Sequence, residues 1–415
     1  EEIVITRPCA GQITYIYCLR FSGSAFTRPA LKDDQLFEDA SYYRKLGKLP
    51  SCKFAFCFVS MHPFHSLLFS FLNLLLDIET KYRISALNLY TIAHNKQYTK
   101  SGKGLDVVYW PESTVDFRTA CLKQLYQTAL PTYGESICFC FAGSRPTFWK
   151  MPKREDVDIY FSLWGCKALF EWITLPQLVS LIAFLLTENY ITVVGSNVES
   201  ISKCVTLLPQ IIRPFFWTCP VISLLPPDLS DILESPMATI IGLHKQFSKF
   251  VQNNALIIDL DLHKITYPSE LPEYKLPKED LLISLLDPLW ETQKIGGQTG
   301  IYQTILRIIF EFIIDTFVRP HINSLITKVT SDGPIGTIFF QETFFSHFQK
   351  TDKEFLERFM DTQLFTGARE QLCRMKTKYN DVSNAQFETI IGKSGFWPQT
   401  QKIISRFEID EISFV

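Results

Sequence analysis

Two acidic side chains, Asp259 and Asp261, have the spacing that would let them bind a cation together. They lie at the end of the apolar run 255–261, so in a strand both carboxylates would point from one face. A magnesium site normally adds a bound phosphate and further oxygen donors, which this short pattern does not include. We therefore favour a strand that runs into a turn over a cation site at this position.

The histidine and cysteine pairs of the sequence also lack the pattern of a metal site. His62 and His65 resemble half of a zinc ligand set, but they lie around Pro63 at a predicted helix start, with no nearby Cys or carboxylate. Cys138 and Cys140 have the alternate spacing of one strand face and not the Cys-x-x-Cys spacing of zinc sites. We expect structural roles for these residues and no metal ion or other cofactor.

The chain also lacks the motifs of common catalytic sites. Residues 101–104 and 296–300 contain several glycines, but neither stretch joins a strand to a helix with the Lys-Ser/Thr pair of a phosphate-binding loop. The nucleophile motif Gly-x-Ser-x-Gly and the zinc motif His-Glu-x-x-His do not occur. These absences favour a protein that acts through its surface and performs no covalent catalysis.

Composition narrows the class of protein further. The 415 residues are 47% hydrophobic and 14% aromatic, enough for the cores of two or three domains. The 43 acidic and 41 basic residues nearly cancel, so we expect no nucleic acid as partner. The 11 cysteines are an odd number and lie in apolar stretches, which favours reduced thiols. The uncharged run 172–187 contains Pro176 and is too short to span a membrane.

The hydrophobic pattern of the first part of the chain alternates between strands and helices. Apolar runs of strand length occur at 13–21, 52–60, 84–93 and 135–141. Helical spacing of apolar residues predicts helices over 63–77 and 117–127. These elements predict a small α/β sandwich, and the polar, Pro-containing stretch 143–158 predicts a linker after it.

Beyond the linker, amphipathic helices alternate with continuous apolar strands. Thr174 is placed to cap the first of these helices, and a buried strand follows at 190–194. Ser196 begins a capping-box pattern for the next helix, and further strands are predicted within 236–242 and 255–261. Such a pattern is typical of a mainly parallel sheet covered by helices.

The last part of the chain is predicted to be helical. An apolar stripe runs from 301 to 312, and short helices are predicted at 344–348 and 355–359. Asp352 or Thr351 could cap the second short helix. Periodicity is weak from about residue 376, so we expect a partly ordered tail.

Two stretches resemble segments of the DENN domain. In 175–242, a helix ending in Leu-Leu-x-Glu precedes a buried strand, a Ser, Leu-x-Pro, a Trp, Leu-Pro, Ser-Pro and a Gly, which resembles the central DENN segment. Residues 355–365 resemble the downstream segment, with its Thr-Gln-x-Phe ending at a capped helix. The N-terminal part, with His-Pro-Phe before a Leu-rich helix, is similar to the upstream, longin-like segment. Together the three cover most of 10–370.

The resemblance implies an α/β protein with two lobes. These are an N-terminal longin-like α/β sandwich and a C-terminal α/β lobe with a helical extension. The implied upstream, linker, central, downstream and tail segments are 1–142, 143–158, 159–320, 321–378 and 379–415.

DENN proteins mostly act as guanine-nucleotide exchange factors for Rab GTPases in vesicle trafficking. The resemblance therefore implies a Rab-type partner, bound preferentially in its GDP-bound or nucleotide-free form. It also implies a cytoplasmic protein recruited peripherally to endosomal or other vesicle membranes. A GTPase-activating protein that supplies an arginine and a non-catalytic Rab-binding scaffold remain open. Among the arginines, Arg20, Arg213 and Arg307 could equally have packing or helix-surface roles.

Ligands of open α/β sheets favour the loops after the carboxyl ends of strands. This rule and the resemblance together give the following candidate GTPase-binding residues: His62, Pro63, Phe64, Glu188, Gly195, Ser196, Asn197, Pro226, Pro227, Ser235 and Pro236. A structural role stays open for each, such as a helix cap at Ser196 or a turn at Pro226. If they bind the GTPase, we expect Phe64→Ala with Asn197→Ala to impair exchange without lowering the melting temperature.

Overall fold

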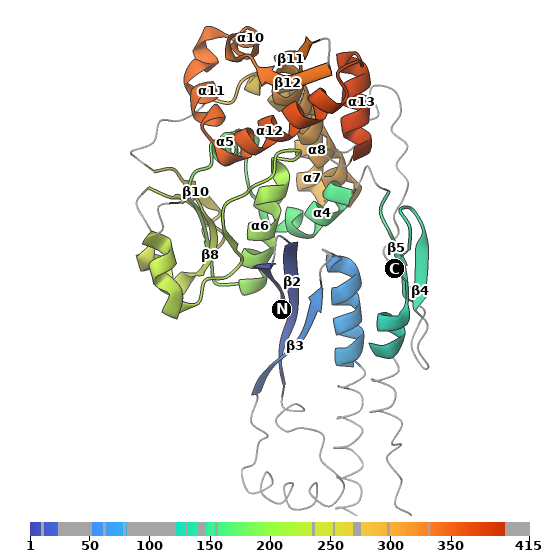
Figure 1. Ribbon diagram of the computed structural model, residues 1–415. Helices are drawn as coiled ribbons and strands as arrows, with labels where there is room; N and C mark the ends of the chain where they lie inside the picture. Colours follow the sequence, from blue (N-terminus) through green and yellow to red (C-terminus); the bar gives the residue numbers. More distant parts are fainter. Residues whose placement is uncertain are drawn as a thin grey trace, which may run out of the picture. The chain divides into compact units, whose positions relative to one another are not determined.

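The chain forms two compact units, each of which mixes helices with strands (Figure 1). The computed structural model describes residues 1–9, 12–23, 52–60, 64–77, 80, 122–129, 131–139, 147–153, 157–234, 237–251, 254–268, 275–296, 299–330 and 333–394. Unit 1 contains Glu1–Ile3 and Arg7–Met151, and unit 2 contains Val4–Thr6 and Pro152–Val415. The predicted α/β class is confirmed.

A three-stranded sheet is formed by the N-terminal strands in the order β1-β2-β3. The strands are β1 (Glu2–Cys9), β2 (Gln12–Gly23) and β3 (Cys52–Ser60). β2 and β3 confirm two predicted strands, whereas β1 was not predicted. They pair antiparallel, and their side chains alternate, so that Tyr17 and Leu19 are buried while Cys57 and Val59 are exposed.

The helix over 65–77 supplies the main apolar face of unit 1, as predicted from its Leu and Phe spacing. Phe69 on this helix packs edge-on against Tyr17, with ring centroids 5.5 Å apart. His65 is also buried, which fits the structural role expected for it. The helix over 122–127 confirms the end of the second predicted helix, whereas the predicted strand 84–93 lies outside the described residues.

A hairpin of β4 (Ser136–Phe139) and β5 (Thr147–Lys150) completes the described part of unit 1. β4 confirms the strand predicted at 135–141. β5 lies within the stretch 143–158, so this part of the predicted linker is a strand. Its Trp149 is buried and donates a hydrogen bond to the Ser66 hydroxyl at 3.3 Å, which joins the hairpin to the helix over 65–77.

Unit 2 is built on a five-stranded sheet in the order β10-β9-β6-β8-β7. Its strands are β6 (Ile191–Gly195), β7 (Val221–Ile222), β8 (Ile240–His244), β9 (Leu256–Asp259) and β10 (Lys264–Thr266). β6 pairs in parallel with β8 and β9, and β7 pairs in parallel with β8. Only β10 is antiparallel among these described strands, so the prediction of a mainly parallel sheet is confirmed.

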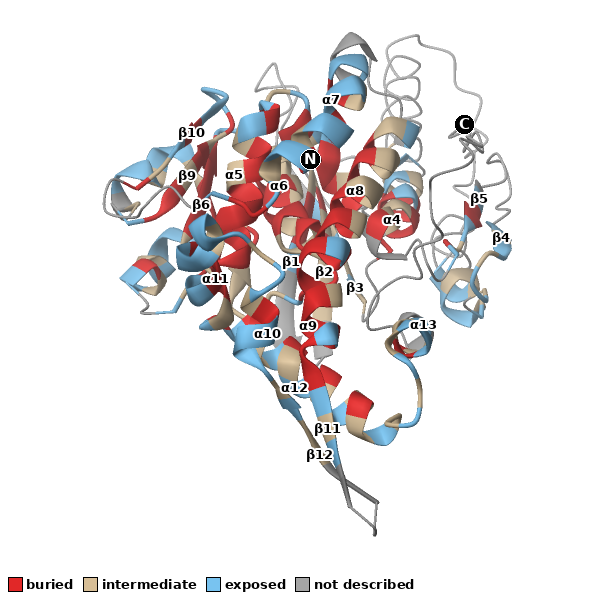
Figure 2. Ribbon diagram, turned by 90° about the horizontal axis from the view of Figure 1, so that it is seen from above, coloured by how far each residue is buried: buried red, intermediate tan, exposed pale blue. Residues whose placement is uncertain are grey.

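Helices cover this sheet because its strands are apolar on both faces. α6 (Val198–Ile211) packs against β6 and β8, and α4 (Val157–Phe170), α5 (Leu175–Leu186), α7 (Glu279–Gly296) and α8 (Thr299–Ile313) share one apolar core with it. All residues of β6 are buried, and buried positions dominate α5 and α6 in Figure 2. Thr174 caps α5 as predicted, through a reciprocal pair of hydrogen bonds with Gln177.

The contact between α4 and α6 depends on a glycine. A Cβ atom at Gly165 of α4 would lie 2.4 Å from the Lys203 carbonyl oxygen of α6. Any larger residue would therefore push α4 away from α6. None of the helices among the described residues is both long and apolar enough to span a membrane.

The C-terminal part of unit 2 combines short helices with a hairpin. Its elements are a π-helical turn (Ile314–Val318), α9 (Arg319–Asn323), β11 (Leu325–Thr330), β12 (Gly333–Phe339), α10 (Gln341–Phe345), α11 (Lys353–Met360), α12 (Gln363–Lys378) and α13 (Asn384–Ser394). α10 and α11 lie close to the two short helices predicted. The β11–β12 hairpin, which lies in the part of the chain predicted to be helical, and α13 were not predicted.

One predicted helix cap and one predicted helix end differ in the structure. Asp352 precedes α11, but its carboxylate accepts a hydrogen bond from the Gln349 backbone N–H at 3.1 Å and caps no N–H group of α11. Thr362 begins α12, where its hydroxyl accepts a hydrogen bond from the Phe365 N–H at 3.2 Å. The Thr-Gln-x-Phe pattern is therefore a helix start, whereas we had predicted it at a helix end.

An aromatic cluster around His321 fills the C-terminal core. The imidazole stacks on Phe365, with ring centroids 4.8 Å apart, and meets the ring of Phe339 at 4.8 Å and that of Phe344 at 6.1 Å. The side chain is fully buried, and neither ring nitrogen has a hydrogen-bond partner among the described residues. Burial lowers the pKa of His321 to about 3, and the charge of Arg369 acts in the same direction.

We expect acid to destabilise unit 2 through His321. The pKa rises from about 3 in the folded chain to its ordinary 6.5 on unfolding, so the neutral ring's contribution is complete above pH 6.5 and is lost as the pH falls. Each pH unit below 6.5 should cost about 1.4 kcal/mol. Thermal melts between pH 7 and pH 5 should show a smaller fall for His321→Phe than for the wild type. His347→Phe is the control because His347 is exposed, and an equal change for both variants would contradict the assignment.

Candidate functional site

The carboxyl ends of the parallel strands in unit 2 lie along one edge of the sheet. Gly195 of β6 is in register with His244 of β8, and Val194 is in register with Asp259 of β9. The residues that follow these strands are therefore neighbours in space although they are up to 65 positions apart in the chain. We call this edge, with the loops after β6, β7, β8 and β9, the carboxyl edge.

Asp261 is the centre of the polar contacts at the carboxyl edge. Its Oδ1 accepts a hydrogen bond from the Ser196 backbone N–H at 3.0 Å, and its Oδ2 accepts one from the Ser196 hydroxyl at 2.5 Å. The Lys245 ammonium lies 3.1 Å from the same Oδ2. The hydrogen bonds from Ser196, followed by Lys245, hold the pKa of Asp261 below its usual range. One carboxylate thus fixes the loops after β6 and β8.

Asp259 makes local contacts and no shared site with Asp261. Its Oδ1 accepts hydrogen bonds from the backbone N–H groups of Asp261, at 3.0 Å, and Leu262, at 2.9 Å. This is the turn that the sequence favoured over a cation site. In the part of the chain that the structure describes, no group of three or more His, Cys, Asp or Glu side chains could hold a metal ion.

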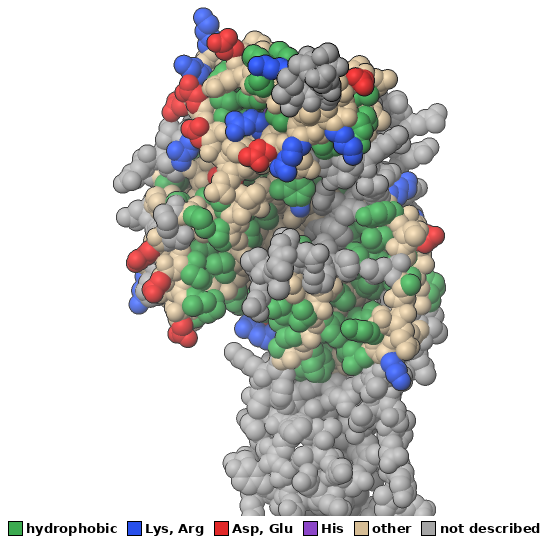
Figure 3. All heavy atoms as spheres, viewed as in Figure 1, with side chains coloured by type: hydrophobic (Ala, Val, Ile, Leu, Met, Phe, Trp, Pro, Cys, Tyr) green, Lys and Arg blue, Asp and Glu red, His purple; other side chains and the backbone are tan. Residues whose placement is uncertain are grey.

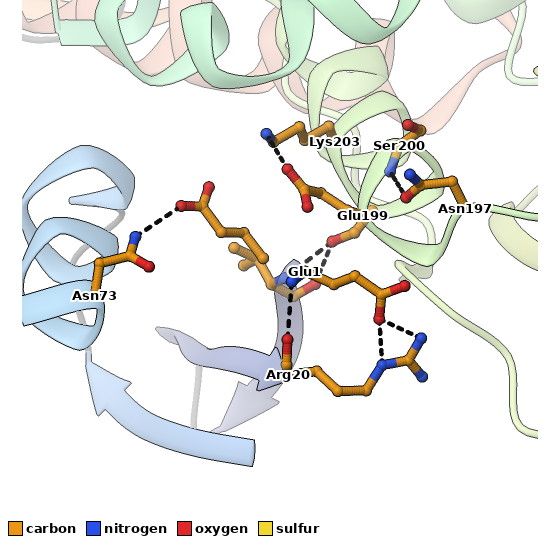
Figure 4. Close-up of polar contacts among 10 residues, drawn as sticks. Glu1, Arg20, Asn73, Asn197, Glu199, Ser200 and Lys203 are labelled. Atoms are coloured by element: carbon orange, nitrogen blue, oxygen red, sulfur yellow. Dashed lines mark hydrogen bonds and ion pairs between the residues drawn. The ribbon is translucent and has the colours of Figure 1, made fainter. Parts of the chain in front are cut away.

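Asn197 is the N-cap of α6. Its Oδ1 accepts a hydrogen bond from the Ser200 N–H at 3.1 Å. Glu199 in the same first turn forms an ion pair with Lys203 of the next turn, at 2.6 Å (Figure 4). The predicted cap, Ser196, was therefore wrong by one position. The physical reason is that the Ser196 hydroxyl is bonded to Asp261, which leaves the following asparagine to cap the helix.

Glu188 lies at the opposite, amino end of β6 and joins it to α12. Its backbone has a φ of 47°, and its carboxylate accepts hydrogen bonds from the N–H groups of Gln363 at 2.7 Å and Leu364 at 2.9 Å. Burial raises the pKa of Glu188, and the two hydrogen bonds oppose that rise. Glu188 therefore stabilises the start of α12, away from the carboxyl edge.

The other candidate residues have different positions. Phe64 belongs to unit 1 and is buried, with its ring centroid 5.1 Å from that of Trp149. Pro226 and Pro227 are exposed at the start of the 3-10 helix Pro227–Glu234, which follows β7. His62, Pro63, Ser235 and Pro236 lie outside the described residues.

Four residues of the carboxyl edge were not among the predicted GTPase-binding residues. Lys245 and Asp261 form an ion pair at this edge, and Leu262, which directly follows Asp261, is 66% exposed. Each follows the end of a parallel strand, so the rule that selected Ser196 could also have found them. Leu229 also follows the end of a parallel strand: it lies in the 3-10 helix after β7 and is 50% exposed.

Comparison with known proteins decides the family. The profile of the DENN (AEX-3) domain matches residues 51–263, about half of the chain, and this range includes the whole carboxyl edge. The chain belongs to the DENN family. The resemblance seen in the sequence is thereby confirmed.

Curated DENN relatives are similar over part of their length. The mouse (Mus musculus) DENN domain-containing protein 1A is 23% identical over 316 residues, 75% of this chain and 27% of the relative. The human (Homo sapiens) DENN domain-containing protein 2C is 29% identical over 211 residues, 48% of this chain and 22% of the relative. The chain thus spans about a quarter of the length of these relatives.

The structure changes the expectation for the double variant of Phe64 and Asn197. Phe64 is in the core and Asn197 caps a helix, so we now expect both substitutions to lower the melting temperature. Loss of exchange in that variant would therefore not separate recognition from stability.

Asn197 can be tested for its capping role on its own. Asn197→Ala should lower the free energy of unfolding by about 1 kcal/mol, because the Ser200 N–H loses its acceptor. Asn197→Asp should keep the stability, since aspartate is an equally good N-cap. Urea denaturation of the two variants measures the difference, and equal stability of Asn197→Ala and wild type would contradict the assignment.

Proposed function

We propose that this DENN chain is a guanine-nucleotide exchange factor that binds a Rab-type small GTPase and promotes GDP release. The observation that carries the proposal is the DENN match over 51–263. The absence of a metal-binding cluster among the described residues is compatible with it, because exchange requires no covalent step. An exchange factor acts by binding the nucleotide-free GTPase more tightly than the nucleotide-bound form, which shifts the equilibrium towards release.

We place the GTPase contact of unit 2 at the carboxyl edge. Ser196 and Asn197 are exposed there, as are Pro226 and Pro227, so their side chains are accessible to a partner. Leu229 and Leu262 add exposed apolar surface of the kind that anchors protein interfaces. The hydrogen bonds of Asp261 fix the loop after β6 before binding, which lowers the ordering cost of association.

Surface charge supports recognition by shape and apolar contact. On the face shown in Figure 3, Lys and Arg side chains are interspersed with Asp and Glu over the part of unit 2 formed by α10, α11 and α12. The net charge of the chain is −2. Neither feature provides the basic stripe that nucleic-acid binding uses.

Two arginines that could have served a GTPase-activating mechanism are engaged within their own units. Arg213 donates to the Gln210 side chain at 3.0 Å, and its guanidinium lies 4.0 Å from the ring centroid of Phe216. Arg20 forms an ion pair with Glu1, drawn in Figure 4. An arginine that assists GTP hydrolysis must reach the nucleotide, so these contacts argue against Arg20 and Arg213 in that role and leave Arg307 as the remaining candidate.

The proposal also covers the segments of the chain, the cellular role and the remaining contact residues. We propose a longin-like upstream lobe over 1–142, a central segment over 159–320 and a downstream segment over 321–378, with 143–158 between the lobes and 379–415 as the tail. We also propose that the protein works in vesicle trafficking, is cytoplasmic, and is recruited peripherally to endosomal or other vesicle membranes with its GTPase. His62, Pro63, Ser235 and Pro236 remain proposed contacts, whereas Phe64, Glu188 and Gly195 act through the fold.

Release of fluorescent GDP from a panel of Rab proteins tests the proposal. The wild-type chain should accelerate release from at least one member. Leu229→Glu with Leu262→Glu should reduce that acceleration at least about tenfold, equivalent to about 1.4 kcal/mol, because a buried unpaired carboxylate weakens the interface. The melting temperature should stay unchanged, since both leucines are exposed.

Leu281→Glu is the matched control. Leu281 is a leucine of unit 2 with 51% exposure, but it lies on α7 and not on the carboxyl edge, so its variant should exchange as the wild type does. Equal loss in the control would show that the carboxyl edge is not the contact. Faster GTP hydrolysis without faster GDP release would overturn exchange in favour of GTPase activation, and binding with neither effect would indicate a scaffold.

A further inference from the structure

Two cysteines face each other across the β2–β3 pair of unit 1. Cys18 of β2 is directly opposite Cys57 of β3 in the antiparallel register. Their Sγ atoms are 3.0 Å apart, and both residues are free thiols. Of the cysteines that the structure describes, these are the two whose thiols contact each other.

The backbone already has the geometry that a disulfide needs. Directly opposite residues of antiparallel strands have Cα atoms about 4.5 to 5.5 Å apart, within the range of about 4.4 to 6.8 Å found across disulfides. The sulfur atoms must approach from 3.0 Å to a bond length of about 2.05 Å. Small rotations of the two side chains achieve this, and the strand register stays unchanged.

The pair lies on the accessible face of the strands. Ala55, Cys57 and Val59 of β3 are exposed, and Cys18 is half-buried, whereas Tyr17 and Leu19 on the other face of β2 are buried. A small oxidant can therefore reach Cys57 directly. Cys166 and Cys204, by contrast, are fully buried in the core of unit 2.

We propose that Cys18 and Cys57 form a reversible redox site, in which a low-molecular-weight disulfide such as glutathione disulfide converts the two thiols into an intrachain disulfide. The site stands on the register, the sulfur distance and the exposure of Cys57. It is independent of the proposed exchange activity.

Oxidation of the pair takes two thiol–disulfide exchange steps. The Cys57 thiolate attacks one sulfur of glutathione disulfide, which forms a mixed disulfide and releases one glutathione thiolate. Cys18 then loses its proton to water, and its thiolate attacks the Cys57 sulfur and expels the second glutathione. Two protein thiols are oxidised by two electrons, and one glutathione disulfide is reduced to two thiols.

Cys57 acts as the attacking thiol because it is the more exposed of the two. Burial, followed by the contact with Cys57, raises the pKa of Cys18 to about 12. The Cys18 thiolate is therefore scarce near neutral pH, and the second step should become about tenfold faster for each pH unit from 7 to 9.

The disulfide would tie β2 to β3 and fix their register. It would close a chain loop that includes residues 24–51, and closing a long loop restricts the unfolded chain. We expect the oxidised form to melt about 5 °C or more above the reduced form.

Equilibration of the full chain with glutathione buffers of increasing disulfide content tests the site. After alkylation of the remaining thiols, peptide mass spectrometry should show a peptide pair linked through Cys18 and Cys57, and addition of dithiothreitol should remove the link. Cys57→Ser should abolish it, and Cys18→Ser should leave Cys57 as a stable glutathione adduct. Cys138→Ser is the control, because Cys138 is exposed on β4 and contacts no described cysteine, so the link should form as before.

Two results would overturn the proposal. One is full alkylation of both thiols, or a persistent glutathione adduct on Cys57 of the wild type, under strongly oxidising buffer at pH 8. The other is a link from either cysteine to a different partner. The exposure of Cys57 makes its serine variant compatible with folding, and a thermal melt of the reduced protein checks this directly.

Discussion

β6 pairs in parallel with β8 on one side and with β9 on the other, and unit 2 depends on this pairing. Every residue of β6 is buried, so its backbone groups must find partners within the sheet and its side chains must be covered by helices on both faces. Parallel strands require a crossover connection between them, and α6 is part of the connection that leaves β6. The pairing also brings the loops that follow these strands to the same edge.

Most polar groups at that edge are already satisfied within the chain. Ser196 is bonded to Asp261, Asn197 caps α6, and Asp259 closes a turn. A partner would thus meet loops of fixed shape, with exposed prolines and leucines between them. This combination suits recognition by contact, because the polar side chains already have partners and the exposed residues between them are apolar.

The C-terminal helices are joined to this core by different means. The carboxylate of Glu188 accepts two backbone hydrogen bonds at the start of α12, and the ring of Phe359 on α11 packs edge-on against Phe215, which follows α6. His321 lies within the neighbouring aromatic cluster as a neutral ring. Residues 353–378 are therefore part of the core of unit 2.

The sequence by itself determined the elements with strong local periodicity, the parallel sheet and the family. Strands such as β2, β3 and β6 and helices such as α5 are visible because side-chain alternation and helical spacing act over a few residues. The tertiary structure decided what depends on partners far apart in the chain. Asp261 occupies Ser196 and so moves the cap of α6 to Asn197, and the strand register places Cys18 opposite Cys57. The β11–β12 hairpin was missed for a related reason, since its inner face is completed by Thr377 of α12, which bonds to Thr337 at 2.8 Å. Local sequence patterns predict which face of a helix or strand is apolar. Hydrogen-bond partners and cross-strand neighbours are determined only when distant segments pack together.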